Sequence, residues 1–522
     1  MVIAEDESVV GMSSSVEEVF DPLKPSPQFL SVDIKRRPSY LLGLDVGTSG
    51  VRAALFDESG NEIKGSERRR MRHATPMSSF GEIDADEIVE LVIETIDELL
   101  ATSTTDDGQI AHISISCFWH SLIGVDTNDK PTTPLLTWAD TRASSVIHQL
   151  ESHFDETAIH QRTGCRFHPS YWPAKLLWLK QEQQDRFNMT VRWLGFSEYL
   201  ELKLFSEFAA SVSMSSATGL FDQRKCDWDW DFISQLGISS DSLPAVRSSV
   251  GPKLKRSFIE RWKPLAEARL VSTLGDGAAN NIGGGCCTKE RIALMIGTSG
   301  AMRVVYKGEP PENLPSGLWS YRADSQRVTL GGALSDGGGL YRWLTDSLSI
   351  GGDEAEIEKE LASLSPDAHG LTVLPFWSGE RSTGWSINAR GGILGLTQGT
   401  KPIEIVRAAM EAVSYRFALI ARGLETIVPG ATIVATGNAL RSSAVWRQII
   451  ADVLGRQVSF GGISEASLRG AALLALEAVG TIQNIEDLPF TIDQVVEPDM
   501  TRHSVYQAAI DRQEKFYSRL FE

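Results

Sequence analysis

Residues 41–56 read LLGLDVGTSGVRAALF, and residues 291–306 read RIALMIGTSGAMRVVY. Each stretch places Gly-Thr-Ser-Gly between two short apolar runs, which predicts a β-hairpin with a tight turn of small residues. A hairpin that occurs twice in one chain indicates two halves of related architecture. The repeated turn therefore predicts a duplicated α/β fold.

The two turns are candidate phosphate sites. Small side chains leave backbone N–H groups accessible, and the turn hydroxyls add further donors. A Walker motif is absent, because no Gly-x-x-x-x-Gly-Lys pattern occurs and a strand rather than a helix follows. One such turn is more typical of an ordinary hairpin, but two copies in matched contexts favour phosphate binding. The candidate residues are Thr48, Ser49, Gly297, Thr298 and Ser299.

Asp45 distinguishes the first copy from the second, which has Met295 at the corresponding position. A carboxylate aimed at bound phosphates is a common ligand of Mg²⁺, which takes its other ligands from water and the nucleotide. We therefore predict that Asp45 lies at a metal site. The alternative is an aspartate that caps the turn, although an unpaired charge among leucines and valines would be costly.

Composition restricts the class of protein. The 522 residues include 68 acidic and 50 basic side chains, a net charge of −18, which argues against general nucleic-acid binding and against adhesion to anionic membranes. The five cysteines lack metal-ligand spacing, which favours reduced thiols and a cytoplasmic location. No apolar run approaches the roughly 18 residues that span a bilayer.

The order of predicted elements follows an α/β rhythm. An acidic, serine-bearing segment, residues 1–39, is expected to be a flexible extension. The pattern then predicts a helix over 84–100, a strand over 112–118 and a helix-rich middle over 142–235. In the second half it predicts helices over 402–426 and 443–454. We place the boundary near Cys286 to Arg291, which gives domains 40–288 and 289–522.

Asp276 is the candidate general base. It lies in Gly-Asp-Gly directly after the apolar run LVSTL, and ligands of open α/β sheets bind beyond the carboxyl ends of strands. Asp-Gly is also a common turn pair, so a purely structural role is the alternative. Its position between two phosphate turns favours catalysis, because a sugar hydroxyl that attacks a γ-phosphate must lose its proton.

Several polar and aromatic residues are candidate ligand contacts. Trp119 and His120 would offer a sugar an aromatic face and a hydrogen-bonding ring, although a lone histidine among apolar residues is more often a core or turn residue. Trp138, Asp140 and Arg142 form either a second sugar contact or a capped helix with an internal ion pair. The loops with Gly379 and with Gly437 and Asn438 are candidate nucleotide contacts.

Together these segments resemble the FGGY family of carbohydrate kinases from residue 40 to about residue 500. DVGTSG and MIGTSGAMR resemble its phosphate motifs, GERSTGWSINARGGILGL its second-domain signature, and GNALRSSAVWRQIIADVLG its adenosine motif. The resemblance implies duplicated actin-like, ribonuclease-H-like ATPase domains that close around Mg²⁺, ATP and a sugar. It also implies Asp276 as the base, Asp45 near the metal, the turn residues and Gly379 at ATP, and Gly437 and Asn438 beside the adenosine. A homodimer is a further expectation.

Within the family, strings such as HSLIGVD, LLTWADTRAS and TGCRFHPSYWPAKLLWL resemble the gluconokinase branch. The resemblance adds His168 to the sugar contacts and makes gluconate the expected substrate. An anionic sugar needs a local positive field in this acidic chain, and the candidates remain open: Arg142, Arg166, His168, Lys175 or Arg381. Asn438, Asp336 and the run from Ser170 to Pro173 depart from the usual pattern, so a pentulose or polyol is the alternative substrate.

A third hypothesis is a sugar- or nucleotide-binding regulator that uses the same fold without transferring a phosphate. The presence of both Asp45 and Asp276 argues against it.

Overall fold

The computed structural model describes residues 38–72, 82–103, 108–247, 250–461 and 466–521. Almost all of the predicted extension lies outside these residues. Ser39, which the prediction placed in the extension, already belongs to the first strand. No helix in the described part of the chain is long and apolar enough to cross a membrane.

The first sheet has five strands in the order β13-β5-β1-β2-β3. The strands are β1 (Ser39–Gly47), β2 (Gly50–Phe56), β3 (Arg68–Met71), β5 (Gln109–Cys117) and β13 (Arg269–Gly275). The pairs β1/β2 and β2/β3 are antiparallel, whereas β1/β5 and β5/β13 are parallel. The first hairpin is therefore confirmed, and the strand predicted over 112–118 is β5.

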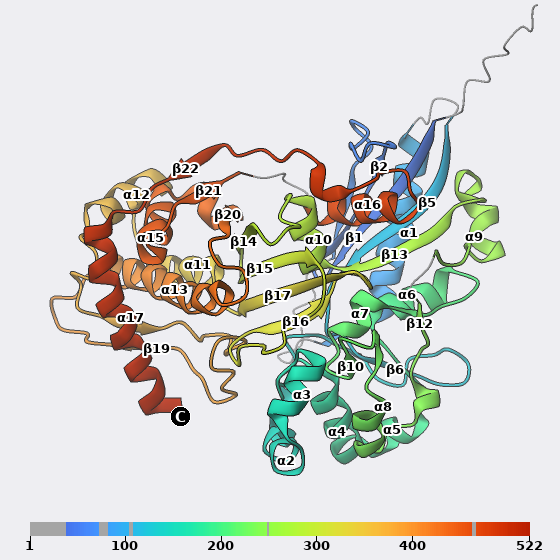
Figure 1. The fold of residues 1–522 in the computed structure, drawn as a ribbon, viewed down its shortest axis with the longest axis horizontal. Helices are drawn as coiled ribbons and strands as arrows, with labels where there is room; N and C mark the ends of the chain where they lie inside the picture. The colour runs from blue at the N-terminus through green and yellow to red at the C-terminus, as the bar shows by residue number, and fades with distance from the viewer. Residues whose placement is uncertain (1–37, 73–81, 104–107, 248–249, 462–465, 522) are drawn as a thin grey trace, which may run out of the picture. The chain divides into compact units, whose positions relative to one another are not determined.

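The second sheet has seven strands in the order β16-β17-β15-β14-β20-β21-β22. They are β14 (Arg291–Ile296), β15 (Gly300–Lys307), β16 (Trp319–Arg322), β17 (Arg327–Leu334), β20 (Thr432–Thr436), β21 (Val458–Phe460) and β22 (Gln494–Val496). Its central five repeat the pattern of the first sheet: β14 pairs antiparallel with β15, β15 antiparallel with β17, and β14, β20 and β21 are parallel. The predicted duplication of architecture is confirmed (Figure 1).

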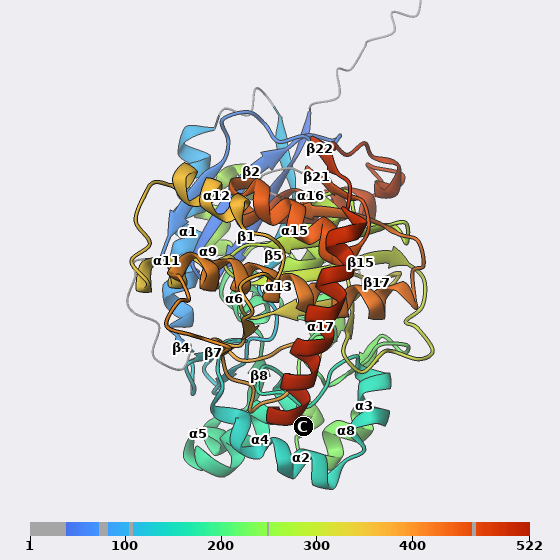
Figure 2. The ribbon, with the colours of Figure 1, turned by 90° about the vertical axis from the view of Figure 1, so that its left-hand side faces the viewer.

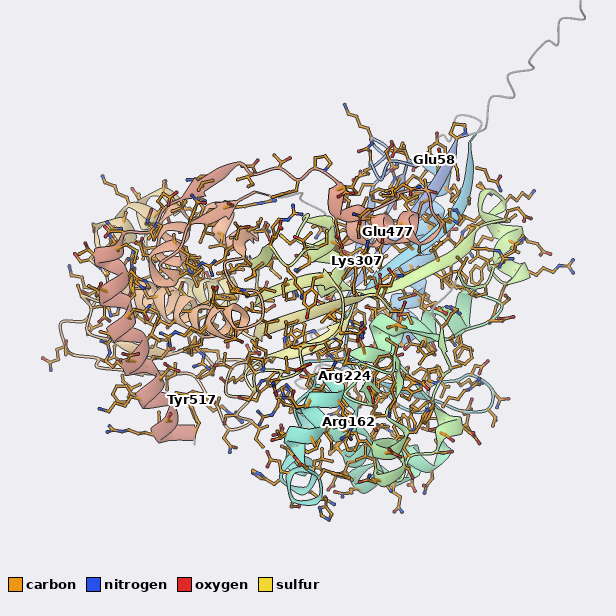
Figure 3. All side chains as sticks on the ribbon, viewed as in Figure 1. Glu58, Arg162, Arg224, Lys307, Glu477 and Tyr517 are labelled. Atoms are coloured by element: carbon orange, nitrogen blue, oxygen red, sulfur yellow. The ribbon has the colours of Figure 1, made fainter. Side chains whose placement is uncertain are left out.

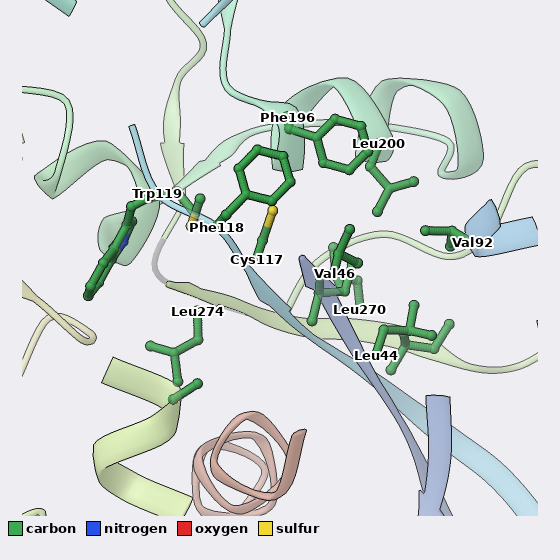
Figure 4. Packing of buried hydrophobic residues seen from close by; sticks show 14 of the residues in the cluster. Leu44, Val46, Val92, Cys117, Phe118, Trp119, Phe196, Leu200, Leu270 and Leu274 are labelled. Atoms are coloured by element: carbon green, nitrogen blue, oxygen red, sulfur yellow. The ribbon is translucent and has the colours of Figure 1, made fainter. Parts of the chain in front are cut away.

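Helices cover both faces of the first sheet. Because strand side chains alternate, Leu42, Leu44 and Val46 face α1 (Ala85–Thr102), which supplies Val92 to the same core (Figure 4). On the opposite face, Leu41 packs with α16 (Ala466–Ala478). This helix comes from the second half of the sequence, so the two halves share one hydrophobic layer.

The close approach of α16 to α10 (Asp276–Gly283) depends on glycine. A Cβ atom on Gly470 would lie 1.9 Å from the carbonyl oxygen of Ala279, and one on Gly283 would lie 1.8 Å from that of Ala466. Neither position accepts a side chain without moving a helix. The small residues of α16 therefore allow it to pack tightly against the helix that begins at Asp276.

The helices of the second half follow the sequence prediction closely. The predicted helix over 402–426 is α13 (Pro402–Glu425), and the one over 443–454 is α15 (Ala444–Leu454), capped by the Ser443 hydroxyl. Figure 2 shows α17 (Met500–Phe521) running across this layer, where it contacts both helices. The layer buries a core of its own against the second sheet.

The segment between β5 and β13 is rich in short helices, as predicted. Its principal members are α2 (Ile147–His153), α3 (Glu156–Thr163), α4 (Trp172–Glu182), α6 (Phe196–Leu204), α7 (Val212–Ser216) and α8 (Trp230–Gln235). Helices α2, α3, α4 and α8 contribute to a third core, which includes Trp172 and Trp228, whereas α6 and α7 pack into the core of the first sheet. This region carries most of the predicted sugar contacts.

Candidate active site

The carboxyl edge of the first sheet brings Asp45 and Asp276 together. In β1, Asp45 is paired with Ser116 of β5, and Ser116 is paired with Leu274 of β13. Asp276 follows two residues later as the first residue of α10. Because β1, β5 and β13 are parallel, both carboxylates lie at the edge where ligands of α/β sheets bind.

Glycines on either side of Asp276 admit the ring of Trp119. A Cβ on Gly275 would lie 1.8 Å from the indole, and one on Gly277 would lie 2.6 Å from it. The indole Nε1 donates to the carbonyl oxygen of Ser213 at 3.1 Å, and the side chain is buried. Trp119 therefore forms the wall behind the candidate base.

The surroundings of Asp276 change its pKa in the direction expected for a general base. Solvent reaches its side chain, but the protein packed around it raises the pKa above the usual aspartate value. The guanidinium of Arg303 opposes this rise, as does the N–H of Gly277, which donates to the carboxylate at 2.7 Å. Arg303 was not predicted from the sequence, where it is one of two charged residues on an otherwise apolar strand.

Asp45 has the environment expected of a metal ligand. Burial raises its pKa, and the negative charge of Asp276 raises it further. The cation facing it is Arg52, whose Nη1 is 3.4 Å from the carboxylate and whose charge lowers the pKa. Asp45 faces the negative charge of Asp276 as well as Arg52. A carboxylate oxygen is a preferred ligand of Mg²⁺, so these residues fit a divalent cation bound between Asp45 and phosphates.

The two Gly-Thr-Ser-Gly turns differ in structure although their letters are identical. In the first, Gly47 pairs with Gly50 across a two-residue loop; in the second, Ile296 pairs with Gly300, which leaves a loop of three. Among the described residues, none of the four threonine and serine hydroxyls of the turns makes a hydrogen bond to the protein. These hydroxyls are therefore available to phosphate oxygens.

A glycine run supports the second turn and was missed as a site element. The N–H groups of Gly337 and Gly339 donate to Thr298 at 3.0 Å, and that of Gly338 donates to Gly297 at 2.7 Å. The run leads into α11 (Gly338–Ser347). Three successive glycines before a helix were the available signal in the sequence.

The predicted adenosine residues lie next to this turn. Gly437 has φ of 105°, and a Cβ there would lie 2.2 Å from the carbonyl oxygen of Ile296, so glycine is required. Asn438 begins α14 (Asn438–Ser442) and lines a pocket of about 100 Å³ with Asn280 and Gly284. A neighbouring pocket of about 180 Å³ also includes Gly437. These pockets lie where the prediction places adenosine, but the contact of Gly437 and Asn438 with adenosine stays a prediction.

Gly379 lies on a loop that connects the phosphate and sugar regions. Its φ is 79°, and the space around it is open. Before it, Ser378 donates its N–H and hydroxyl to Asp336 at 2.8 and 2.9 Å. Asp336, one of the departures from the usual family pattern, is therefore held by Ser378. The ATP contact predicted for Gly379 remains a prediction.

His120 is poised for a neutral sugar contact. Its backbone is left-handed, with φ of 67°, and its Nδ1 donates to the carbonyl oxygen of Ala217 at 2.7 Å. Burial, and next the charge of Arg381, lower its pKa well below the usual value. In the described part of the chain Nε2 has no hydrogen-bond partner, so it can accept from a hydroxyl.

An aromatic group surrounds His120 and was not predicted as a unit. Its ring meets Tyr171 and Tyr321 edge-on at 5.1 and 5.5 Å, and the two tyrosine hydroxyls are 2.6 Å apart. Tyr321 also stacks on Trp319 at 4.3 Å. Tyr171 belongs to the run that departs from the gluconokinase pattern, and its partners come from the other half of the chain.

His168 joins the two halves directly. Nδ1 accepts from the N–H of Ser170 at 3.2 Å, so Nε2 carries the proton and donates to the carbonyl oxygen of Glu380 at 3.0 Å. Burial lowers the pKa of His168 to about 3, which keeps it neutral. Both ring nitrogens are occupied, so its predicted sugar contact would have to use a carbon edge of the ring.

Asp140 and Arg142 adopt the alternative arrangement of an internal ion pair. The Arg142 side chain donates to Asp140 at 2.5 and 3.1 Å, binds Glu82 at 2.7 Å, and lies over the ring of Trp178. Asp140 is buried, whereas Trp138 is partly exposed. The direct sugar role predicted for Asp140 and Arg142 stays untested, and the structure shows both engaged with protein partners.

A second acidic cluster does not fit a metal. Asp367, His369 and Glu411 place ligand atoms within 4.8 Å of one another. Arg512 binds Asp367 and Arg407 binds Glu411, while His369 Nε2 lies 3.1 Å from Glu411. These bonds form a buried ion-pair network between α13 and α17.

The geometry agrees with comparisons to known proteins. Models of the N-terminal and C-terminal domains of the FGGY family of carbohydrate kinases match residues 40–283 and 292–479. A gluconokinase of Bacillus subtilis is 30% identical over 462 residues, which cover 86% of this chain and 89% of that protein.

Solved structures match over nearly the same length. The gluconate kinase of Lactobacillus acidophilus has a TM-score of 0.82 at 26% identity, and a ligand-bound xylulose kinase of the same species has 0.83 at 26%. Each comparison covers 92% of this chain and 98% of the other. Because models of both of its domains match most of the chain, the protein belongs to the FGGY family of carbohydrate kinases.

Proposed function

We propose that this sugar kinase transfers the γ-phosphate of ATP to a terminal hydroxyl of gluconate or a related sugar acid. The observation that carries the proposal is the juxtaposition of Asp45 and Asp276 at the carboxyl edge of the first sheet. ATP is the phosphate donor of the family, and the sugar is a small-molecule acceptor.

Asp276 would act as the general base. Its carboxylate takes the proton of the acceptor hydroxyl while that oxygen forms a bond to the γ-phosphorus. The bond between the γ-phosphorus and the bridging oxygen breaks, and ADP leaves with the electron pair. A raised pKa suits this role, because it brings proton affinity closer to neutral pH.

Asp45 would hold Mg²⁺ at the β- and γ-phosphates. When bound, Mg²⁺ supplies positive charge that compensates the phosphates. The accessible hydroxyls of Thr48, Ser49, Thr298 and Ser299 would bind phosphate oxygens from the two sides.

The sugar would lie between His120 and Trp138, with its reactive hydroxyl at Asp276. A sugar hydroxyl would donate a hydrogen bond to Nε2 of His120, and the fixed tautomer makes that contact directional. Closure of the two halves would exclude water, which competes with the sugar for the γ-phosphate. The bridge from His168 to Glu380 is one contact that favours closure.

The sugar-acid preference rests on the gluconokinase relatives. A pentulose or polyol is the second candidate, because the xylulose kinase structure is as similar as the gluconate kinase structure. The two candidates differ in charge, which makes them separable by kinetics.

The test is a panel of acceptors with ADP release measured by a coupled assay. Gluconate should give a kcat/KM well above those of xylulose, ribulose and glycerol. A preference for a pentulose, with gluconate at the background rate, would make the sugar-acid assignment wrong. Absence of ADP release above background with every acceptor, although sugar or ATP still binds, would instead support the regulator alternative.

The cytoplasmic location and the homodimer are also part of the proposal. Light scattering of the purified full chain would give twice the mass of 57.2 kDa for a dimer. A mass of one chain at the concentrations of the assay would contradict the homodimer.

A further inference from the structure

The sequence leaves five cations as candidates for the positive field that an anionic sugar needs, and the structure separates them. Arg142 is bound to Asp140 and Glu82, and Arg166 is bound to Glu156 at 2.5 Å. Their charges are therefore compensated by neighbouring carboxylates.

His168 and Lys175 are also bound to protein groups. His168 is neutral and donates to a carbonyl oxygen. Lys175 is fully buried, donates to the carbonyl oxygen of His120 at 2.6 Å, and has a pKa lowered by burial to about 7. Lys175 thus supports the backbone of a sugar contact rather than reaching the sugar.

Arg381 differs from the other four. Its guanidinium lies over the ring of Trp138, 4.8 Å from the ring centroid. Among the residues that the structure describes, the guanidinium forms no hydrogen bond and no ion pair with a carboxylate. Stacking on an indole holds its plane while leaving the N–H groups at its edge open.

The position of Arg381 directs it to the sugar region. Its charge acts on the pKa of His120, His168 and Asp276, so it lies within electrostatic range of all three. These side chains come from the first half of the chain, while Arg381 comes from a loop of the second. The residue before Arg381 holds this loop in place, because the carboxylate of Glu380 binds Arg416 at 2.5 Å.

We propose that Arg381 is the carboxylate-binding residue of this kinase, which receives the acid group of an open-chain sugar acid on the platform of Trp138. The inference deepens the proposed function and rests on it. A planar guanidinium binds a carboxylate through two parallel N–H bonds, which fixes both charge and orientation. The acid end on Arg381 would place the far hydroxyl at Asp276, between the two turns.

The experiment compares gluconate with D-glucitol, which has the same carbon chain and a CH₂OH group in place of the carboxylate. Arg381→Gln should lower kcat/KM for gluconate about 10- to 100-fold, the loss expected for a charged hydrogen-bonded pair. Turnover of D-glucitol or a pentulose should change less than about threefold, because these acceptors make no ion pair. Arg381→Lys should retain part of the gluconate activity.

Arg390→Gln is the matched control. Arg390 lies on the same loop, is exposed, and donates to the backbone carbonyls of Ile387 and Ala389. The Arg390→Gln substitution removes the same positive charge as Arg381→Gln. Its kcat/KM values for gluconate and D-glucitol should equal those of the wild type.

Three outcomes would overturn the inference. An equal loss on charged and uncharged acceptors would mean that Arg381 acts on the transferred phosphate or on folding. Calorimetric binding of gluconate in the presence of a non-hydrolysable ATP analogue provides the second readout. Equal affinity in wild type and Arg381→Gln, or no gluconate binding to the wild type, would contradict a carboxylate site. The acceptor panel tests the proposed function separately, because it asks only which sugar the wild type uses.

Discussion

Asp276 combines access to solvent with a carboxyl group whose proton affinity is raised by the surrounding protein. Arg303 lies on β15 of the second half and opposes that rise. The pKa of the proposed base is thus influenced by a residue from the second half of the chain. This arrangement gives two predictions at the scale of single side chains.

Asp276→Asn should remove the general base while retaining the side-chain shape. We expect kcat to fall by about 10²- to 10⁴-fold, the usual contribution of acid–base catalysis. ATP and sugar should still bind, as calorimetry can measure. Near-normal turnover would show that another group takes the proton.

Arg303→Met should shift the acid limb of the pH–rate profile. A base works only when deprotonated, so the rate falls as pH decreases through its pKa. Loss of the neighbouring cation raises the pKa of Asp276 further, and the limb should move to higher pH. Arg303→Lys retains the charge, so its acid limb should lie at the pH of the wild type. An unshifted limb in Arg303→Met would contradict the interaction between Arg303 and Asp276.

At the scale of elements, α10 and α16 meet at Gly283 and Gly470 and hold the helix that carries Asp276. Gly470→Ala should destabilise the protein by about 3 kcal/mol, because a methyl group 1.9 Å from a carbonyl oxygen forces the helices apart. Gly399→Ala is the control, since its Cβ would meet no atom closer than 3.8 Å. Urea unfolding measures both, and equal stabilities would contradict the close contact.

The sequence predicts elements whose determinants are local. Both hairpins, α13 and α15 follow from apolar periodicity and caps, and the catalytic candidates follow from their place after strands. The sequence does not predict that α16 packs on the first sheet, because Gly470 meets Ala279 across almost two hundred residues. It likewise leaves five candidates for the positive field, since Glu82, which pairs with Arg142, and Glu156, which pairs with Arg166, lie on other elements.

At the scale of the whole molecule, two buried neutral histidines make the free energy of unfolding depend on pH. His160 donates to Leu318 and has a pKa lowered by burial to about 4, while His168 has one of about 3. Both side chains take up a proton on unfolding below pH 6.5, the ordinary histidine value. Each bond joins the first half of the chain to the second.

The free energy of unfolding should therefore decrease as pH falls from 6.5 toward 4. Each histidine contributes about 1.4 kcal/mol per pH unit in this window, because the unfolded chain binds the extra proton. Urea titrations at a series of pH values measure the slope. His160→Gln retains a donor for Leu318 and should reduce the slope by about that amount; an unchanged slope would exclude His160 as the source.

Figure 3 labels Lys307 of β15 and Glu477 of α16, which are 3.5 Å apart. The helix that carries Glu477 also covers Leu41, Phe56 and Val271 of the first sheet. A gene cut at residue 288 would therefore yield one product with a bare apolar sheet and another with an apolar helix that has nothing to cover. The duplicated halves no longer correspond to separable modules: only the continuous polypeptide, or both pieces made together, can complete the half that contains the base.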